Sequence, residues 1–296
     1  MKLLLTGAWR DAQKHASLLS DMGHEIIFLQ YEADPLPCDP REVEGVVCNS
    51  LFLHHDIRLF EKLRYIRLTS AGFDRVDTDY IASRGIELYN ARGVYSIPMA
   101  EHAVAAVLNL YRHFASFVRR QEVRCWQKDR SLSELYGKTV CILGCGSVGT
   151  ECAKRFAAFG CRVVGLDLVT QPKPSFETIY PISETEKAIA AADVVILTLP
   201  LTEQTEGMVD KAFLDTLKDG CVLVNIARGK LVDSAALIEE LKKRRISAAL
   251  DVFDEEPLPS DSPLWGMENV LITPHNSFVS DAVGDRLSRL IIEGLK

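Results

Sequence analysis

The sequence lacks several features that would place it in a specialised class of protein. Its eight cysteines include no Cys-x-x-Cys pair, so neither a zinc site nor a disulfide framework is indicated. No stretch approaches the roughly 18 apolar residues of a membrane-spanning helix, and the apolar run Met1–Leu5 is too short for a signal peptide. We therefore expect a globular cytosolic protein with no membrane association and no bound metal.

The sequence also lacks an excess of positive charge. The 34 Lys and Arg residues are outnumbered by 41 Asp and Glu residues, which gives a formal net charge of −7. Proteins that bind nucleic acid by neutralising its phosphates need a basic surface, so we expect no nucleic-acid partner. The one basic run, Lys242–Arg245, ends a predicted helix, where cations are favourable for the helix itself.

Apolar runs alternate with helical patterns along the chain, which is typical of parallel sheets covered by helices on both faces. A length of 296 residues favours two such domains. The first strands are predicted at residues 3–6, 25–29, 45–48, 65–69 and 86–89. Six more are predicted at 139–143, 162–166, 194–198, 222–225, 247–250 and 270–272. Two helices are predicted at the domain passages, one from Met99 to about Arg120 that begins behind Pro98, and one over about 279–295.

The most informative stretch is Gly144-Cys-Gly-Ser-Val-Gly149, which follows an apolar strand and begins a helical pattern. Gly144 allows a tight turn, Gly146 lets a pyrophosphate approach the backbone, and Gly149 lets helix and strand pack closely. The phosphates would bind the unpaired N–H groups at the start of the helix. The next strand ends on Asp167, whose carboxylate would accept hydrogen bonds from a ribose 2′-hydroxyl. Because a carboxylate repels a 2′-phosphate and no arginine follows, NAD is favoured over NADP.

Chemically useful residues follow three strands of this second domain, where open α/β sheets bind their ligands. Arg228 follows the strand at 222–225 and could bind a carboxylate through two N–H donors. An acidic loop, Asp251–Pro257, follows the next strand, and His275 follows the last. A histidine exchanges protons near neutral pH, and a carboxylate partner would fix its orientation. This set suits hydride transfer between nicotinamide and a 2-keto or 2-hydroxy acid.

Eight motifs in order carry a resemblance to a known family. They are Ser70-Ala-Gly-Phe-Asp74, Met99-Ala-Glu-His102, Leu135-Tyr-Gly-Lys-Thr139, the Gly144–Gly149 turn, Leu199-Pro-Leu-Thr202, Asn225-Ile-Ala-Arg-Gly229, Asp251-Val-Phe-Asp-Glu-Glu-Pro257 and Thr273-Pro-His275. Over nearly its whole length the chain resembles the D-isomer-specific 2-hydroxyacid dehydrogenases. The resemblance implies a flavodoxin-like substrate domain of residues 1–97 plus 278–296 and a Rossmann NAD domain of residues 98–277, with a cleft between them. It also implies a homodimer through the NAD domain, with the helix from Met99 as a candidate contact.

The resemblance further implies roles for individual residues. Arg228 would bind the substrate and polarise its carbonyl, while His275 would act as acid/base with Glu256 as its partner. Backbone N–H groups of the Ser70–Gly72 turn (Ser70, Ala71 and Gly72) would hold the substrate carboxylate, and Asp251 would hold the nicotinamide carboxamide. The implied cofactor is NAD, and the residues expected to contact it are Gly144, Gly146, Ser147, Val148, Gly149, Asp167, Leu199, Pro200, Thr205, Ile226, Ala227, Asp251 and His275.

The sequence leaves two chemical types of substrate possible. A small unphosphorylated 2-keto acid such as glyoxylate, hydroxypyruvate or a branched acid is preferred, because the loop at 49–55 and Leu68 lack the arginines expected for a phosphate. An activity of the D-3-phosphoglycerate dehydrogenase type would need substitutes for those arginines, for which the candidates are His54, His55, Arg67 and Arg75. The chain also ends at Lys296, earlier than relatives of this family usually do and without the regulatory domain that many phosphoglycerate dehydrogenases carry.

Two other functions are alternatives to reduction of a 2-keto acid. Formate dehydrogenases share the fold but pair the histidine with glutamine, and Glu256 argues against that reaction. A non-metabolic NAD-sensing scaffold, similar to the C-terminal-binding corepressors, would keep Arg228, Glu256 and His275. Inactivity on a panel of 2-keto acids with retained NADH affinity would favour the scaffold.

Overall fold

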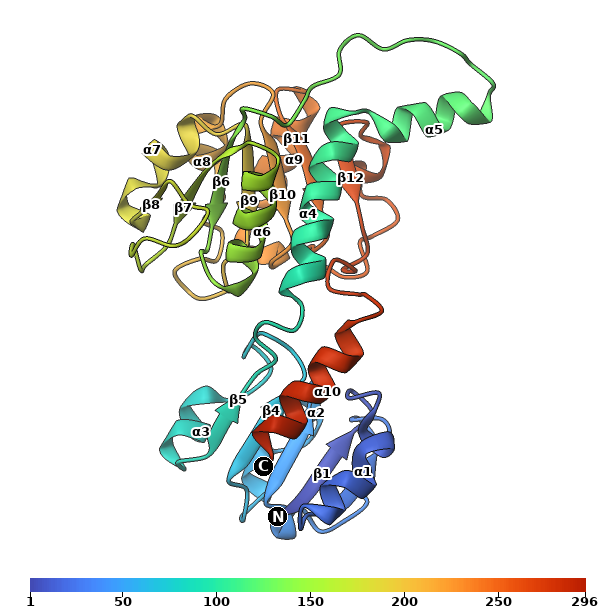
Figure 1. The fold of residues 1–296 in the computed structure, drawn as a ribbon, viewed down its shortest axis with the longest axis vertical. Coiled ribbons are helices and arrows are strands. Elements are labelled where there is room, and N and C mark those ends of the chain that lie inside the picture. The colour runs from blue at the N-terminus through green and yellow to red at the C-terminus, as the bar shows by residue number, and fades with distance from the viewer. The chain divides into compact units, whose positions relative to one another are not determined.

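A computed structural model describes all residues, Met1–Lys296, and the chain divides into two compact units (Figure 1). Unit 1 comprises Met1–Tyr95 and Ser280–Lys296, and unit 2 comprises Ser96–Val279. Unit 2 is therefore inserted into the sequence of unit 1. No helix is long and apolar enough to cross a membrane.

Unit 1 is built on one five-stranded sheet with the order β2-β1-β3-β4-β5, and every pairing is parallel. The predicted strands are confirmed, with ends that differ by a residue at most. The strands are β1 (Lys2–Thr6), β2 (Glu25–Leu29), β3 (Gly45–Cys48), β4 (Tyr65–Leu68) and β5 (Glu87–Tyr89), and the helices are α1 (Ala12–Asp21), α2 (Leu51–His54), α3 (Thr78–Ser83) and α10 (Val283–Gly294).

Both faces of this sheet are covered, as the alternation along β1 requires. Leu4 joins one apolar cluster with residues of β3, β4 and α3, whereas Leu3 and Leu5 join a second cluster with α10. α10 contributes Leu287 and Ile291 to that second cluster, so a segment near residue 290 completes a layer begun at residue 3. The last helix begins at Val283 rather than near residue 279 as predicted.

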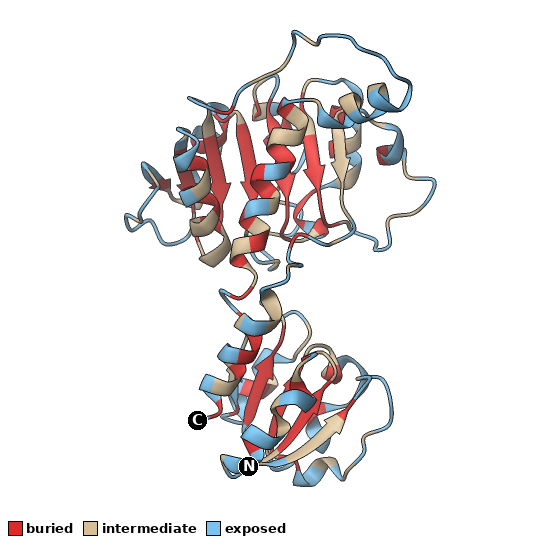
Figure 2. Ribbon diagram, turned by 45° about the vertical axis from the view of Figure 1, so that its right-hand side comes forward, coloured by how far each residue is buried: buried red, intermediate tan, exposed pale blue.

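Unit 2 is built on a seven-stranded parallel sheet with the order β12-β11-β10-β9-β6-β7-β8. Its strands are β6 (Thr139–Leu143), β7 (Arg162–Leu166), β8 (Thr178–Tyr180), β9 (Val194–Leu197), β10 (Val222–Asn225), β11 (Ser247–Leu250) and β12 (Val270–Ile272), and its helices are α4 (Ser96–Tyr111), α5 (Phe114–Glu122), α6 (Ser147–Ala158), α7 (Thr185–Ala190), α8 (Lys211–Thr216) and α9 (Ser234–Lys242). The central strands are buried while the strand at each edge is more exposed (Figure 2). α4 and α6 cover one face, and α7, α8 and α9 cover the other.

Two predictions about unit 2 were wrong in detail. The six predicted strands are all present, but the short edge strand β8 was missed, because of its three residues only Ile179 is buried. The single helix predicted from Met99 to about Arg120 is two helices, α4 and α5, which meet at His113. His113 has a left-handed backbone (φ 53°), which ends α4 without the proline or glycine that would reveal a break in the sequence.

At the carboxyl edge of the sheet in unit 1, the Glu32 side chain joins three strand ends. It accepts hydrogen bonds from the Thr6 hydroxyl (2.7 Å), the Asn49 N–H (2.7 Å), and the Ser50 N–H (2.6 Å) and hydroxyl (2.7 Å). Burial raises the pKa of Glu32, but the hydrogen bonds together outweigh burial and leave the pKa below its ordinary value. The carboxylate therefore contributes stability that is present above its unfolded pKa and is lost as pH falls through the folded pKa.

Replacing Glu32 with glutamine tests this contribution. The amide NH₂ group of Glu32→Gln faces a backbone N–H donor, so we expect a loss of about 1–3 kcal/mol in the free energy of unfolding at pH 7. The difference from wild type should shrink as pH falls below about 4. Urea unfolding at pH 7 and at lower pH measures both, with Glu61→Gln on the exposed surface as the control. A difference that stays constant over this range would contradict the assignment.

Candidate active site

The glycine-rich turn connects β6 to α6 through two close backbone approaches. Gly144 has φ +96°, and a Cβ there would lie 2.8 Å from the Thr198 carbonyl carbon. At Gly149 a Cβ would lie 2.0 Å from the Gly144 carbonyl oxygen. That oxygen also accepts a hydrogen bond from the Thr198 hydroxyl at 2.6 Å. The turn is thus fixed by strand β9 as well as by β6, and it leaves the start of α6 at the carboxyl edge of the sheet.

Gly146 differs from these two glycines, because no atom lies within 4 Å of the position that a Cβ would take. The open space lies at the N-terminal end of α6, where Ser147 and Val148 begin the helix. Ser147 Oγ lies 2.7 Å from the Ser96 hydroxyl, which fixes this end of α6 against the start of α4. The free backbone N–H groups and the positive end of the helix dipole suit a pyrophosphate.

Asp167 lies one residue beyond β7, next to the glycine-rich turn. Its two carboxylate oxygens accept hydrogen bonds from the Cys145 N–H (2.6 Å) and the Val169 N–H (3.1 Å). The Lys173 ammonium donates to the carbonyl of the same residue, Cys145, at 2.5 Å. Lys173 was not predicted from the sequence, because the cation expected for a 2′-phosphate is an arginine directly after Asp167.

Arg228 follows β10 in a turn that Asn225 holds together. The Asn225 side chain is buried (1% exposed); it accepts from the Ala227 N–H (3.1 Å) and donates to the Arg228 carbonyl (2.9 Å). The Arg228 guanidinium donates to the Ala227 carbonyl at 2.8 Å. At Gly229 a Cβ would lie 2.0 Å from the carbonyl carbon of Phe253. Arg228 is therefore held beside the acidic loop that follows β11.

Glu256 and His275 come together, although 18 residues separate them in the sequence. His275 Nδ1 lies 2.8 Å from one carboxylate oxygen of Glu256, and the other oxygen accepts the Phe253 N–H at 3.0 Å. An ionised carboxylate only accepts hydrogen bonds, so His275 Nδ1 carries a proton and Nε2 is the atom that exchanges one. Both side chains are more than a third exposed. The Phe278 ring meets the imidazole edge-on, with 5.8 Å between the ring centroids.

Asp251 is the buried acid of the site (1% exposed), and its carboxylate is bound by the loop that carries His275. It accepts hydrogen bonds from the Thr273 hydroxyl (2.6 Å), the Asn276 N–H (2.8 Å) and the Ser277 N–H (3.0 Å). Burial raises the pKa of Asp251, but these hydrogen bonds outweigh burial and lower it. His275 itself has a left-handed backbone (φ 49°), which costs about 1–3 kcal/mol in a residue other than glycine.

The other predicted cofactor residues lie around the same edge of the sheet. Leu199 is buried and Pro200 is exposed just beyond β9. The Thr205 hydroxyl closes the following turn, because it donates to the Pro200 carbonyl (2.8 Å) and accepts the Thr202 N–H (2.8 Å). Ile226 and Ala227 are buried beyond β10.

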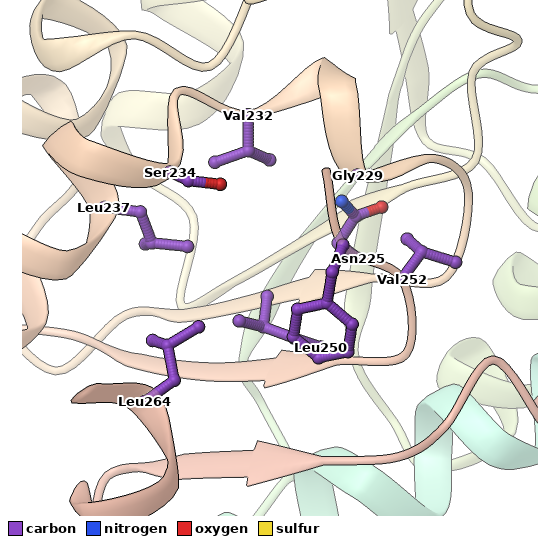
Figure 3. Close-up of a pocket in the computed structure, with 9 residues that line it drawn as sticks. Asn225, Gly229, Val232, Ser234, Leu237, Leu250, Val252 and Leu264 are labelled. Atoms are coloured by element: carbon purple, nitrogen blue, oxygen red, sulfur yellow. The ribbon is translucent and has the colours of Figure 1, made fainter. Parts of the chain in front are cut away.

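Beneath the Arg228 turn, unit 2 encloses a cavity of about 20 Å³ (Figure 3). Its walls are mainly apolar and come from β10, β11, α9 and the adjoining loops; they comprise Asn225, Gly229, Val232, Ser234, Leu237, Leu250, Val252, Phe253 and Leu264. A space of this size holds about one water molecule. It is therefore a packing gap behind the turn and too small for a 2-keto acid.

The Ser70–Gly72 turn lies in unit 1, directly after β4, and the Ser70 hydroxyl donates to the Gly72 carbonyl at 3.2 Å. Arg67 of the same strand does not serve as a phosphate-binding substitute, which corrects the suggestion from the sequence. It is 7% exposed, donates to the Tyr65 hydroxyl (3.1 Å) and lies 4.6 Å from the centroid of the Tyr89 ring. A Cβ at Gly294 would touch its guanidinium, so Arg67 lies against the C-terminal end of α10.

A glycine-rich strand-to-helix turn with an acid after the next strand is typical of a dinucleotide-binding domain, and the imidazole–carboxylate pair lies at the same edge of its sheet. The family model of the D-isomer specific 2-hydroxyacid dehydrogenase NAD binding domain matches residues 104–277. Because this match covers more than half of the chain, the protein belongs to that family.

Two curated relatives illustrate the range of the family. The D-3-phosphoglycerate dehydrogenase of Archaeoglobus fulgidus is 34% identical over 221 residues, which cover 74% of this chain and 42% of the relative. The glyoxylate reductase of Korarchaeum cryptofilum is 33% identical over 249 residues, which cover 81% of this chain and 75% of the relative. This chain thus spans less than half the length of the first relative.

Two solved structures have the same fold. A D-isomer specific 2-hydroxyacid dehydrogenase from Xanthobacter autotrophicus, in complex with NADPH and MES, is 27% identical, with a TM-score of 0.82 over 99% of this chain and 93% of that chain. The D-lactate dehydrogenase of Aquifex aeolicus, complexed with NAD and lactic acid, has a TM-score of 0.84 over 99% of this chain and 94% of that chain. At 24% identity, the second likeness shows the fold alone.

Two glycine variants separate packing from cofactor binding. In Gly149→Ala the new methyl group meets the Gly144 carbonyl, and we expect the free energy of unfolding to fall by about 1–3 kcal/mol. In Gly146→Ala the methyl group enters open space, so stability should stay within about 0.5 kcal/mol of wild type. NADH affinity should nevertheless fall about tenfold or more, a difference of 1.4 kcal/mol.

Thermal unfolding and NADH titration measure the two effects. The assignment of the turn to the pyrophosphate would be wrong if Gly146→Ala bound NADH as wild type does.

Proposed function

We propose that this protein is an NAD-dependent oxidoreductase that interconverts a small 2-keto acid and the D-2-hydroxy acid by hydride transfer. The observation that carries the proposal is the 2.8 Å contact between His275 Nδ1 and Glu256. It leaves Nε2 to exchange a proton at the edge of the sheet where Arg228 also lies. A histidine held this way serves a reaction that needs one proton for each hydride.

The residues of the chain take distinct parts in this reaction. Protonated at both nitrogens, His275 donates from Nε2 to the carbonyl oxygen of the keto acid, and Glu256 stabilises the imidazolium before transfer. Arg228 binds the substrate carboxylate and stabilises negative charge that develops on the carbonyl oxygen. The Ser70–Gly72 turn supplies backbone N–H groups for the same carboxylate. The nicotinamide, when bound, supplies the hydride, and Asp251 is proposed to hold its carboxamide.

We further propose that the dinucleotide is NAD, with its pyrophosphate at Gly146–Val148 and its adenosine ribose at Asp167. Leu199, Pro200, Thr205, Ile226 and Ala227 complete the proposed contacts. The position of Asp167 supports the preference, because its carboxylate would repel a 2′-phosphate. Lys173 acts against the preference, because its ammonium binds the carbonyl of Cys145, the residue whose N–H binds Asp167, and a cation near Asp167 would attract a 2′-phosphate.

A phosphorylated substrate is the second candidate, favoured by the phosphoglycerate dehydrogenases among the curated relatives. The burial of Arg67 removes one of the residues that could have bound the phosphate. His55 is also engaged, because its Nε2 lies 2.9 Å from the Glu32 carbonyl. We therefore propose an unphosphorylated acid, with glyoxylate, hydroxypyruvate and branched 2-keto acids as the first compounds to assay.

A homodimer through unit 2 is also proposed, with α5 and the segment after it joining α4 as the candidate contact. Figure 1 shows that α5 and residues 123–134 extend away from the body of unit 2. Phe114, Val118, Val123 and Trp126 of this arm are each more than half exposed. Such an exposed apolar surface is typical of a protein interface.

We propose a cytosolic location, which the eight free cysteines support. Burial also raises the pKa of Cys152 and of Cys221 to about 12, as expected of inert structural thiols in a reducing compartment.

Two variants test the catalytic roles. His275→Ala should lower kcat by about 10²–10⁴-fold and leave NADH affinity unchanged, because the imidazole acts on the proton. Arg228→Lys should lower kcat about 100-fold, because an ammonium cannot make two parallel hydrogen bonds with a carboxylate.

Steady-state assays of a panel of 2-keto acids with NADH, together with NADH titration, give these values. Near-normal turnover by His275→Ala would refute the acid/base role. An inactive wild-type protein that still binds NADH would favour the scaffold.

Cofactor preference is tested at Asp167. In Asp167→Ser the repulsion of a 2′-phosphate is lost, so NADPH should bind about tenfold more tightly, a gain of 1.4 kcal/mol, and NADH more weakly. Glu177→Gln is the matched control, because Glu177 is an exposed acid of the same unit at the opposite, amino end of these strands, where it pairs with Arg162. An unchanged ratio of NADH to NADPH affinity in Asp167→Ser would contradict the ribose assignment.

A further inference from the structure

Helix α4 carries a histidine that touches the loop following β12. His102 Nε2 lies 3.3 Å from the Thr273 hydroxyl. That hydroxyl donates to Asp251 at 2.6 Å, and Asp251 in turn accepts the N–H groups of Asn276 and Ser277. A continuous series of hydrogen bonds therefore leads from α4 to residues on both sides of His275.

The loop needs such support because of the backbone of His275. Its left-handed conformation (φ 49°) is one that an L-residue adopts when its surroundings hold it there. The His275 N–H donates to the backbone carbonyl of Asp251 at 2.7 Å, while the Asp251 side chain binds the next two N–H groups. Asp251 thus sets the position of His275, and the direction of its carboxylate depends on Thr273.

The order of donors in this series requires that His102 Nε2 carry a hydrogen. Ionised Asp251 only accepts hydrogen bonds, so the Thr273 hydroxyl gives its one hydrogen to Asp251. Toward His102 the hydroxyl can therefore only accept, and His102 Nε2 must carry a hydrogen.

We propose that His102 is a positioning residue for His275, which it holds in place for proton transfer through Thr273 and Asp251. This inference rests on the proposed function, because it concerns the acid/base of that reaction. If His102 only filled space, the effect of replacing it would depend on the volume of the new side chain. If His102 positions the loop, the effect depends instead on its one N–H group. Glutamine can place an N–H near the position of Nε2 and should therefore substitute for it.

The test uses substitutions at both ends of the His102–Thr273 contact in the full chain. His102→Leu and Thr273→Val remove the donor and the hydroxyl at nearly constant volume, whereas His102→Gln and Thr273→Ser keep them. Glu101→Gln, at the adjacent exposed position of α4, is the control and should behave as wild type. For each variant, kcat and KM are measured with NADH and the best 2-keto acid of the panel, and NADH affinity is measured by titration.

His102→Leu and Thr273→Val should each lower kcat by about 10- to 100-fold, as expected for a misplaced catalytic group, while NADH affinity stays within about twofold of wild type. His102→Gln and Thr273→Ser should retain most of the wild-type kcat. The double variant His102→Leu/Thr273→Val should be no slower than the single variants, because both break the same link. The proposal is overturned if His102→Leu turns over normally, if His102→Gln is as slow as His102→Leu, or if the two effects multiply.

Hydrogen exchange of the amides of Asn276 and Ser277 gives a readout that does not need turnover. Exchange should be faster in His102→Leu and Thr273→Val than in wild type, and should return to the wild-type rate in His102→Gln. Equal rates in all variants would overturn the positioning role. If the wild-type protein reduces none of the acids, the proposed function fails while this measurement still decides the inference.

Discussion

The site in unit 2 depends on the parallel alignment of three neighbouring strands, β10, β11 and β12. Their last residues are in register, since Asn225 pairs with Leu250 and Leu250 with Ile272. Adjacent strands in a sheet lie about 4.8 Å apart, so the three loops that follow start side by side along one edge. A guanidinium, a carboxylate and an imidazole from separate parts of the sequence thereby follow three neighbouring strands.

Polar side chains at the strand ends keep these loops in position, although the loops themselves are exposed. Asn225 binds the Ala227 N–H and the Arg228 carbonyl, while Asp251 binds the N–H groups after His275. Glu256 has two tasks, because one oxygen accepts the Phe253 N–H and the other meets the imidazole. Fixed loops of this kind favour catalysis, since little reorganisation is needed when a substrate arrives.

Sequence patterns were sufficient to predict most of the fold and the pairing of His275 with Glu256. Apolar runs gave the strands, because parallel strands buried on both faces are almost continuously apolar. Two features were not predicted. The edge strand β8 has too few buried residues, and the turn at His113 has neither glycine nor proline. The contacts of Asn225, Lys173 and His102 depend on which loops the fold brings together, and no spacing along the chain encodes that. Arg67 was misjudged for a related reason: its residue type suggested an anion site, but its side chain lies against α10.

The insertion of unit 2 into unit 1 has a consequence for the order in which the protein forms on the ribosome. The Trp9 indole donates to the Ser288 hydroxyl at 2.9 Å, and the apolar layer around Leu3 and Leu5 includes Leu287 and Ile291. One face of the sheet formed by the first strands therefore stays uncovered until residues as far as Ile291 have been synthesised. The inserted unit ends at Val279, before α10 begins at Val283, so it can be complete before the unit that flanks it on both sides.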